Sequence, residues 1–222
     1  MNPLVTRPDD TIVLPPWLCG SIGYYALMAR YGHVVVDTAM RHDKRQKAVH
    51  RYDIADTRGV VQLTVPLGKP TAAEGRPTWA HCPVSTHDEW WTRHRITLES
   101  AYGRTPYFEF LVDRFAPLFA PPASWPTWPS AIDMAREADR QIRQVLGLDN
   151  DVRWAPAPAG MQAATINDAP TPPPYWQIRA DRLGFIPGLS ILDLIFNLGP
   201  EAALYLKDYP LPTPNSSLLT PN

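Results

Sequence analysis

The chain has 222 residues, a length that suits one well-buried domain or one domain with a small appendage. Its 21 Lys and Arg residues almost balance its 22 Asp and Glu residues, so no net charge would attract nucleic acid. A hydrophobic share of 45% excludes a disordered chain, and no apolar run reaches the roughly 20 residues of a membrane span.

The first part of the chain has the pattern of a βαβ unit. A short apolar run at 11–14 ends at two prolines and is typical of a strand. Residues 21–31 carry apolar side chains at helical spacing and stop at Gly32, and the β-branched run 33–37 has the length of a buried strand. Because strand, helix and strand follow one another so closely, we expect 11–14 and 33–37 to be parallel neighbours.

Later segments predict one more strand and several helices. Residues 60–67 alternate between apolar and polar side chains, as a half-buried strand does. Helical spacing then recurs in four segments, 88–102, 107–119, 130–146 and 190–197. The expected fold class is α/β, with a small parallel or mixed sheet that the βαβ unit starts and several helices that cover it.

Prolines divide the chain, because 17 of the 26 lie from Pro117 onward. We expect an α/β domain over 1–148, followed by a linker or surface connection over the Ala- and Pro-rich residues 149–174. The apolar segment 175–208 should form C-terminal helices on the same domain, with largely buried side chains at Phe185, Leu194, Phe196 and Leu204. Residues 209–222 are expected to be a frayed tail.

Two candidate site residues follow the predicted parallel strands. Ligands of open parallel sheets bind beyond the carboxyl ends of the strands, and Trp17 and Asp37 both lie at such ends. Asp37 could take part in a site or cap the next segment through its carboxylate. Trp17 could offer a stacking surface to a ligand or pack as an ordinary core residue.

The most charged stretch is 41–51, which holds five of the 21 Lys and Arg residues. Since the chain as a whole is nearly neutral, this stretch is a local cationic patch. It would suit a phosphate or a carboxylate, which arginine can bind through two parallel hydrogen bonds. The candidate contacts are Lys44, Arg45, His50 and Arg51. The alternative is a solvated helix face.

His94 is the candidate for acid–base catalysis. On a helix over 88–102 it lies at the centre of the apolar face, which Tyr102 shares. An imidazole there, near a cationic patch, could act as a general base close to neutral pH. The alternative is a structural histidine whose two nitrogens are both hydrogen-bonded in the core.

Asn197 and Tyr102 are further candidate substrate contacts. Asn197 is a polar residue on an otherwise apolar helix, four positions after Asp193. We expect Asp193 to cap that helix, a role that Asn197 cannot share.

Other chemistries lack their signatures. The sequence contains no GxxxxGK[S/T], no GxGxxG and no GxSxG motif. CxxC and HExxH are also absent, so we expect no metal and no cofactor. The first residues have no apolar signal core, and two cysteines are too few for a disulfide framework, which predicts a cytoplasmic protein.

A series of motifs, spread over roughly 14–206, resembles the WbqC-like proteins. Their order and spacing carry the resemblance, and the late segment looks most like the Bacteroidetes-type branch. The motifs are Tyr24-Tyr25; Arg45, His50-Arg51 and Ile54; Gly59 and Leu63-Thr64-Val65-Pro66; Trp90, His94, Thr97-Leu98, Ala101-Tyr102 and Pro106-Tyr107-Phe108; and Gly184-Phe185, Leu189-Ser190-Ile191, Asp193-Leu194, Phe196-Asn197 and Gly199-Pro200-Glu201. Arg51 keeps an arginine that many members have, whereas His50 stands where they carry asparagine.

The resemblance implies a role in the biosynthesis of surface polysaccharides such as O-antigen. We therefore expect a transferase that acts on a phosphorylated or nucleotide-linked sugar. Arg45 and Arg51 would hold the phosphate. Asp37 would orient or deprotonate the nucleophile, and His94 would serve as acid or base. The alternative is a non-catalytic partner protein in a polysaccharide-biosynthesis assembly. An enzyme should place Asp37, Arg51 and His94 around one cavity, whereas a binding module should scatter them.

Overall fold

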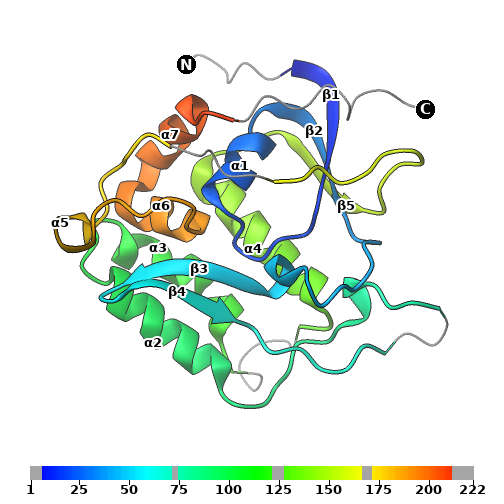
Figure 1. Cartoon of the computed structure of the whole chain (residues 1–222), viewed down its shortest axis with the longest axis horizontal. Coiled ribbons are helices and arrows are strands. Elements are labelled where there is room, and N and C mark those ends of the chain that lie inside the picture. Colours follow the sequence, from blue (N-terminus) through cyan, green and yellow to red (C-terminus); the bar gives the residue numbers. More distant parts are fainter. Residues whose placement is uncertain (1–6, 72–74, 122–127, 167–171, 212–222) are drawn as a thin grey trace.

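A computed structural model describes residues 7–71, 75–121, 128–166 and 172–211 (Figure 1). Its main sheet is parallel, in the order β1-β2-β5, and consists of β1 (Arg7–Leu14), β2 (Tyr31–Asp37) and β5 (Asp151–Ala155). The helix α1 (Ile22–Met28) joins β1 to β2, and Val13 pairs with Val35 in parallel register. The predicted βαβ unit is therefore confirmed.

The third strand of the sheet lies where the sequence predicts a linker or surface connection. Strand β5 pairs along β2 from His33 to Asp37, so the start of the Ala- and Pro-rich range 149–174 is part of the sheet. Five residues followed directly by alternating alanines and prolines give too short a pattern to predict a strand. Within this range, residues 167–171 lie outside the described residues, as do residues 212–222 of the expected tail.

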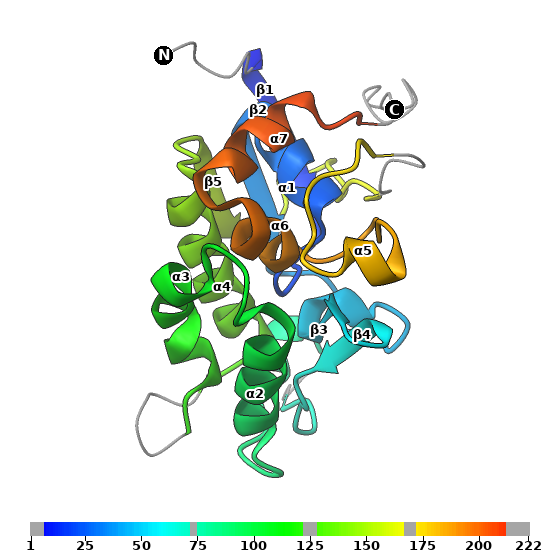
Figure 2. The ribbon, with the colours of Figure 1, turned by 90° about the vertical axis from the view of Figure 1, so that its left-hand side faces the viewer.

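A separate antiparallel hairpin consists of β3 (Arg51–Asp56) and β4 (Gly59–Thr64). Strand β4 corresponds to the predicted strand at 60–67, whereas β3 takes up the end of the cationic stretch. The short helix η1 (Lys47–His50) leads into β3. In Figures 1 and 2 the hairpin lies away from the parallel sheet, with α2 alongside it.

Helices cover the two sheets (Figure 2). The four predicted helical segments contain or overlap helices, and the remaining helices are short. In chain order after η1 they are η2 (Trp79–His81), α2 (Trp90–Tyr102), α3 (Phe108–Phe115), η3 (Ala116–Phe119), α4 (Ala131–Leu146), α5 (Ala180–Leu183), α6 (Ile191–Leu198), η4 (Gly199–Glu201) and α7 (Ala202–Asp208). The fold is thus the expected α/β class. No helix in the described ranges is both long and apolar enough to cross a membrane.

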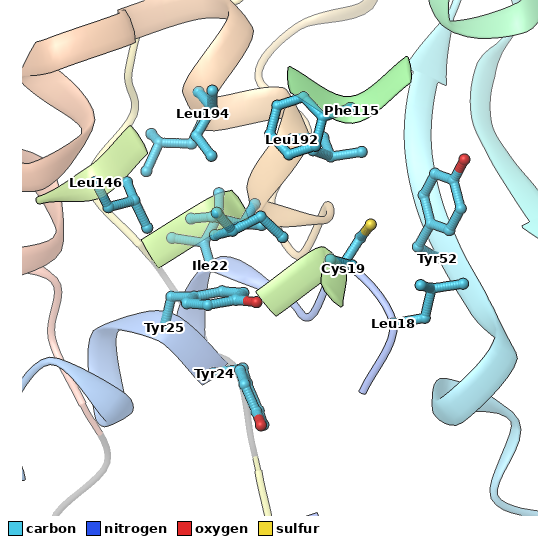
Figure 3. Close-up of a cluster of buried hydrophobic side chains, with 14 of the residues drawn as sticks. Leu18, Cys19, Ile22, Tyr24, Tyr25, Tyr52, Phe115, Leu146, Leu192 and Leu194 are labelled. Atoms are coloured by element: carbon cyan, nitrogen blue, oxygen red, sulfur yellow. The ribbon is translucent and has the colours of Figure 1, made fainter. Parts of the chain in front are cut away.

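The hydrophobic core joins the early and late parts of the chain. Figure 3 shows side chains from three helices meeting, with Tyr52 of β3 at the side: Ile22 and Tyr25 of α1, Phe115 of α3, and Leu192 and Leu194 of α6. Each of these residues is at most 3% exposed. Burial of this apolar surface attaches α6 to the N-terminal βαβ unit.

The four core residues predicted in the C-terminal segment differ in how deeply they are buried. Leu194 and Phe196 are fully buried and Phe185 is partly buried, but Leu204 is 58% exposed. The prediction for Leu204 is wrong because of the turn of α7. Ala202 and Leu206, four positions apart, share the buried face, and Leu204 lies midway between them on the opposite face.

Candidate functional site

A cavity of about 160 Å³ lies where three distant segments of the chain meet. These are the loop after β1, the hairpin with its leading helix η1, and the N-terminus of α6. The cavity is lined by Trp17, Cys19, Ser21, Lys47, Ala48, Arg51, Tyr52, Asp53, Gln62, Gly188 and Ser190. Two of the eleven, Lys47 and Arg51, are cations, and Asp53 is the single carboxylate.

Backbone hydrogen bonds fix these segments against one another. Ser21 and Ser190 form an antiparallel bridge between the starts of α1 and α6, with Ile191 N donating to Gly20 O at 2.8 Å. Ser190 N donates to Asp53 O at 2.9 Å, which ties α6 to β3. Leu18 N donates to Ala48 O at 3.0 Å, which ties the loop after β1 to η1. The walls of the cavity are therefore held by main-chain contacts and not by side chains alone.

A chain of side chains crosses the hairpin at the cavity. Arg51 Nη1 donates to Gln62 Oε1 at 3.1 Å, and Gln62 Nε2 donates to Asp53 Oδ1 at 3.0 Å. Asp53 and Gln62 are opposite each other in the β3–β4 register, and Arg51 is two positions before Asp53 on the same face. The amide thus holds a cation and a carboxylate at fixed positions, side by side in one cavity.

Two polar atoms of the cavity residues are buried and have no hydrogen-bond partner within the described part of the chain. They are Arg51 Nε and Ser190 Oγ. Ser190 is 3% exposed and precedes α6 without capping it, whereas Ser21 caps α1 by accepting from Tyr24 N. An unsatisfied buried polar group destabilises a fold by about 1–3 kcal/mol. Both atoms can donate a hydrogen bond, so the cavity is suited to an acceptor such as a phosphate or carboxylate oxygen.

The backbone at Cys19 is in the left-handed region, with φ of 47°. A non-glycine residue there costs on the order of 1 kcal/mol, and such strain is concentrated at functional sites. The Cys19 thiol itself is fully buried, and burial raises its pKa well above the ordinary value. A thiol held protonated in this way is not a nucleophile, so we assign no nucleophilic role to Cys19.

Two of the residues predicted from the sequence line the cavity, Trp17 and Arg51. Trp17 is half-buried, and its ring meets that of Tyr24 edge-on at 5.6 Å between centroids. It therefore packs in the core on one side while lining the cavity on another.

Three predicted residues lie elsewhere. Asp37 Oδ1 accepts hydrogen bonds from Ala39 N at 2.9 Å and Ala157 N at 3.1 Å, which is the capping role that the sequence left open. Lys44 is exposed, and the Arg45 side chain is 91% exposed and paired with Asp43 at 2.9 Å. None of the three is among the residues that line the cavity.

His50 is half-buried beside the cavity residues but faces β4. Its Nδ1 donates to Val65 O at 2.9 Å, and burial lowers its pKa. The ring also lies 5.9 Å from that of Trp79. These contacts make it a link between η1 and the end of the hairpin.

His94 is in the core, 3% exposed, with both ring nitrogens hydrogen-bonded. Its Nε2 is 3.1 Å from Thr64 O, and a carbonyl can only accept, so this nitrogen carries the proton. Its Nδ1 then accepts from the Tyr52 hydroxyl at 3.0 Å. Burial lowers its pKa to about 4, and the Arg93 charge adds to this effect while the Thr64 carbonyl opposes it. The structure does not bring His94, Asp37 and Arg51 around one cavity; His94 supports the hairpin from behind.

Tyr102 and Asn197 belong to a buried polar cluster around Asp193. The Tyr102 and Tyr175 hydroxyls and the Gln177 amide all donate to the Asp193 carboxylate. Burial raises the pKa of Asp193, and these three hydrogen bonds oppose the rise. Asn197 holds the same region together, because it accepts from Ile178 N and donates to Asp193 O. The cluster fixes α6, whose N-terminus carries Ser190.

Four residues that line the cavity are not among those that the sequence predicts for the site: Lys47, Asp53, Gln62 and Ser190. Lys47 lies in the cationic stretch and Ser190 is the first residue of the predicted helical segment 190–197. Residue type alone does not distinguish a site role from a structural role for either. Asp53 and Gln62 become neighbours only through the register of the hairpin. Within the described ranges, no group of three His, Cys, Asp or Glu side chains could hold a metal ion.

Comparison with known proteins gives one match, to a protein-family model. No curated protein and no solved structure matches the chain. The model of the WbqC-like protein family matches residues 15–168, which includes the loop after β1 and the whole hairpin and stops before Ser190. Because this match covers more than half of the sequence, the chain belongs to the WbqC-like protein family.

Proposed function

We propose that the protein is a transferase that acts on a phosphorylated or nucleotide-linked sugar intermediate in surface-polysaccharide biosynthesis. The observation that carries the proposal is a pair of buried donors, Arg51 Nε and Ser190 Oγ, which have no partner among the described residues and belong to side chains that line one cavity with Lys47. The sugar and the pathway come from the family resemblance. The cytoplasmic location and the Bacteroidetes-type branch are part of the same proposal.

A phosphate group fits the chemistry of this cavity. Guanidinium and ammonium groups supply charge, and the hydroxyl and Nε–H supply directed hydrogen bonds in a shielded place where they are strong. The volume of about 160 Å³ is below the roughly 300–1,000 Å³ of a typical ligand pocket. The cavity therefore suits the phosphate-bearing end of a ligand, with the remainder outside it.

Asp53 is the residue placed to move a proton. The Gln62 amide holds its carboxylate beside Arg51, and Oδ1 accepts only one of the hydrogen bonds that a carboxylate can take. In the transfer, an acceptor hydroxyl gives its proton to Asp53 while its oxygen bonds to the transferred group. The donor's leaving group departs with the electrons of the broken bond. This assignment gives Asp53 the role that the sequence suggested for Asp37 and His94.

The alternative function, a non-catalytic partner protein, has one observation in its favour. The side chain of Phe110 on α3 is 77% exposed, which is unusual for a large apolar residue unless another surface covers it. This function requires no ligand in the cavity, so a ligand-binding experiment separates the two.

Thermal-shift screening against sugar phosphates and nucleotide sugars tests the proposal. A ligand at about 100 Kd should stabilise the protein by roughly 2.7 kcal/mol, which for a chain of this size raises Tm by several degrees. The shift produced by a sugar phosphate should be lost in Arg51→Gln and reduced in Ser190→Ala. Arg45→Gln is the matched control, because Arg45 belongs to the same cationic stretch but is exposed and paired with Asp43. A flat screen, or equal shifts in all variants, would favour the partner role.

A further inference from the structure

A second, larger recess lies at the other end of the hairpin strand β3. Its volume is about 700 Å³, and three of its lining residues are arginines. We call it the arginine groove; it is lined by Thr57, Glu99, Ser100, Ala101, Arg104, Ile178, Arg179, Asp181 and Arg182. Residues before and within α5 form one side of the groove, and the end of α2 with the residues that follow it forms the other.

The cavity at Arg51 and the arginine groove lie at the two ends of β3. Arg51 and Asp53 of β3 line the cavity, Ala55 of β3 lines a small void of about 10 Å³, and Thr57, in the turn after β3, lines the groove. At about 3.3 Å per residue, β3 places Asp53 roughly 10 Å from Asp56, the residue before Thr57. The C-terminal segment faces this whole row, with Ser190 at one end and Arg179 at the other.

The side chain of Arg179 has one N–H group that donates to no acceptor among the described residues. Its Nη2 donates to Ser100 O at 2.8 Å and to Ala101 O at 3.3 Å, in the last turn of α2. These bonds offset the negative end of that helix, which would otherwise repel an anion. Its Nε is buried and unpartnered within the described residues, as Arg51 Nε is in the cavity. Each end of the row thus holds an arginine with one unused, shielded N–H.

The other two arginines of the groove are exposed and unpaired. Neither Arg104 nor Arg182 forms an ion pair in the part of the chain that the structure describes, whereas six other arginines do. Three guanidinium groups around one recess attract a polyanion, which arginine binds through paired hydrogen bonds.

The two carboxylates of the groove narrow the class of ligand. Glu99 and Asp181 would repel a bare polyphosphate but accept hydrogen bonds from sugar hydroxyls. A volume of about 700 Å³ lies within the range of small-molecule sites. A ligand with both phosphates and a hydroxyl-bearing sugar matches this combination of charges.

We propose that the arginine groove binds a nucleoside diphosphate, with its phosphates on Arg104, Arg179 and Arg182. Its ribose hydroxyls donate to Glu99 or Asp181. This inference deepens the proposed function and rests on it for its biological meaning, because the groove would hold the nucleotide part of a nucleotide-linked sugar whose sugar end reaches toward Asp53. The binding itself requires no reaction and is measured separately.

Titration calorimetry of the full chain with UDP, ADP and GDP tests the groove. At least one of the three should bind, and the Arg104→Gln/Arg182→Gln double variant should weaken that binding tenfold or more. Both residues are exposed, so the variant should fold and melt like the wild type. Arg114→Gln, an exposed arginine on α3 outside the groove, is the matched control and should bind as the wild type does.

Several results would overturn the inference. They are no binding of any of the three nucleotides, equal binding by the double variant, or inorganic pyrophosphate binding as tightly as the nucleotide. Arg51→Gln should leave nucleotide binding within about twofold, so that loss of the cavity and loss of the groove are seen as different events. If the cavity fails to bind a sugar phosphate while the groove binds a nucleotide, the proposed function is wrong, but the inference that the groove binds a nucleotide is supported.

Discussion

His94 lends itself to a sharp test, because its buried, neutral ring makes stability depend on pH. The ring is 3% exposed and accepts a hydrogen bond from Tyr52 while donating one to Thr64 O. Replacement by glutamine, His94→Gln, can keep one donor and one acceptor but cannot titrate. At pH 7 we expect this variant to lose about 1 kcal/mol of unfolding free energy, as expected for imperfect replacement of two hydrogen bonds.

The magnitude of the pH effect follows from the shift in pKa. Burial lowers the pKa of His94 from 6.5 to about 4. Above pH 6.5 the ring is neutral in both states; as the pH falls toward 4, the unfolded chain takes up the proton first. Unfolding therefore becomes easier over this window, and the loss reaches about 3 kcal/mol at pH 4, since one pKa unit corresponds to about 1.36 kcal/mol.

Urea unfolding of the wild type and of His94→Gln, at intervals between pH 7 and pH 4, measures this effect. Taking the difference between the two proteins removes other titrating groups, including Asp139 and Asp193, whose pKa values burial raises. The wild type should start about 1 kcal/mol more stable than the variant and end less stable. A stability difference that stays constant with pH would show that His94 titrates normally, and would refute its placement as a buried neutral ring.

Three further predictions concern the core and the late segment. Asp193→Ala leaves the Tyr102 and Tyr175 hydroxyls and the Gln177 amide without their acceptor. Urea unfolding should therefore show that the unfolding free energy falls by about 3–5 kcal/mol. A fall below about 1 kcal/mol would contradict the hydrogen bonding of this buried cluster. Leu194→Ala should lower the unfolding free energy by about 2–5 kcal/mol, because this side chain is fully buried. Leu204→Ala should lower it by less than about 0.5 kcal/mol, because this side chain is 58% exposed. Equal losses would contradict this packing. Burial raises the pKa of both thiols, Cys19 and Cys82. A colorimetric thiol reagent at pH 8 should therefore react with neither thiol in the native protein and with both in urea. A rapid reaction with the native protein would be inconsistent with their burial.

Local patterns account for the parts of the fold that the sequence could predict. The βαβ unit is contained in the consecutive residues 7–37, and its strands and helix each have a distinct periodicity. Strand β3 was missed because the charges of the stretch 41–51 run directly into it, and its alternation of Tyr52 and Ile54 with polar residues covers only six positions. Strand β5 gains its stability from pairing with β2, which no local pattern reveals.

The candidate site shows a different limit. Arg51 and Trp17 were found because residue type and strand ends point to them, but charge alone could not separate Arg51 from Arg45. That distinction depends on which side chain pairs with each arginine. Asp43 pairs with Arg45, whereas Gln62 contacts Arg51 only through the register of the hairpin, and Ser190 is distant in sequence. For His94, the helical spacing correctly put the ring on the buried face. Its partners come from the hairpin, whose position no spacing within the helix can give.

A crystal structure of the protein with a bound sugar phosphate, such as glucose 1-phosphate, would show directly whether Arg51 and Ser190 hold a phosphate. The account predicts phosphate oxygens in the cavity within hydrogen-bond distance, about 3 Å, of both Arg51 Nε and Ser190 Oγ, with Lys47 turned toward them. Density for the phosphate at Arg45 and Lys44, or an empty cavity at saturating ligand, would contradict it.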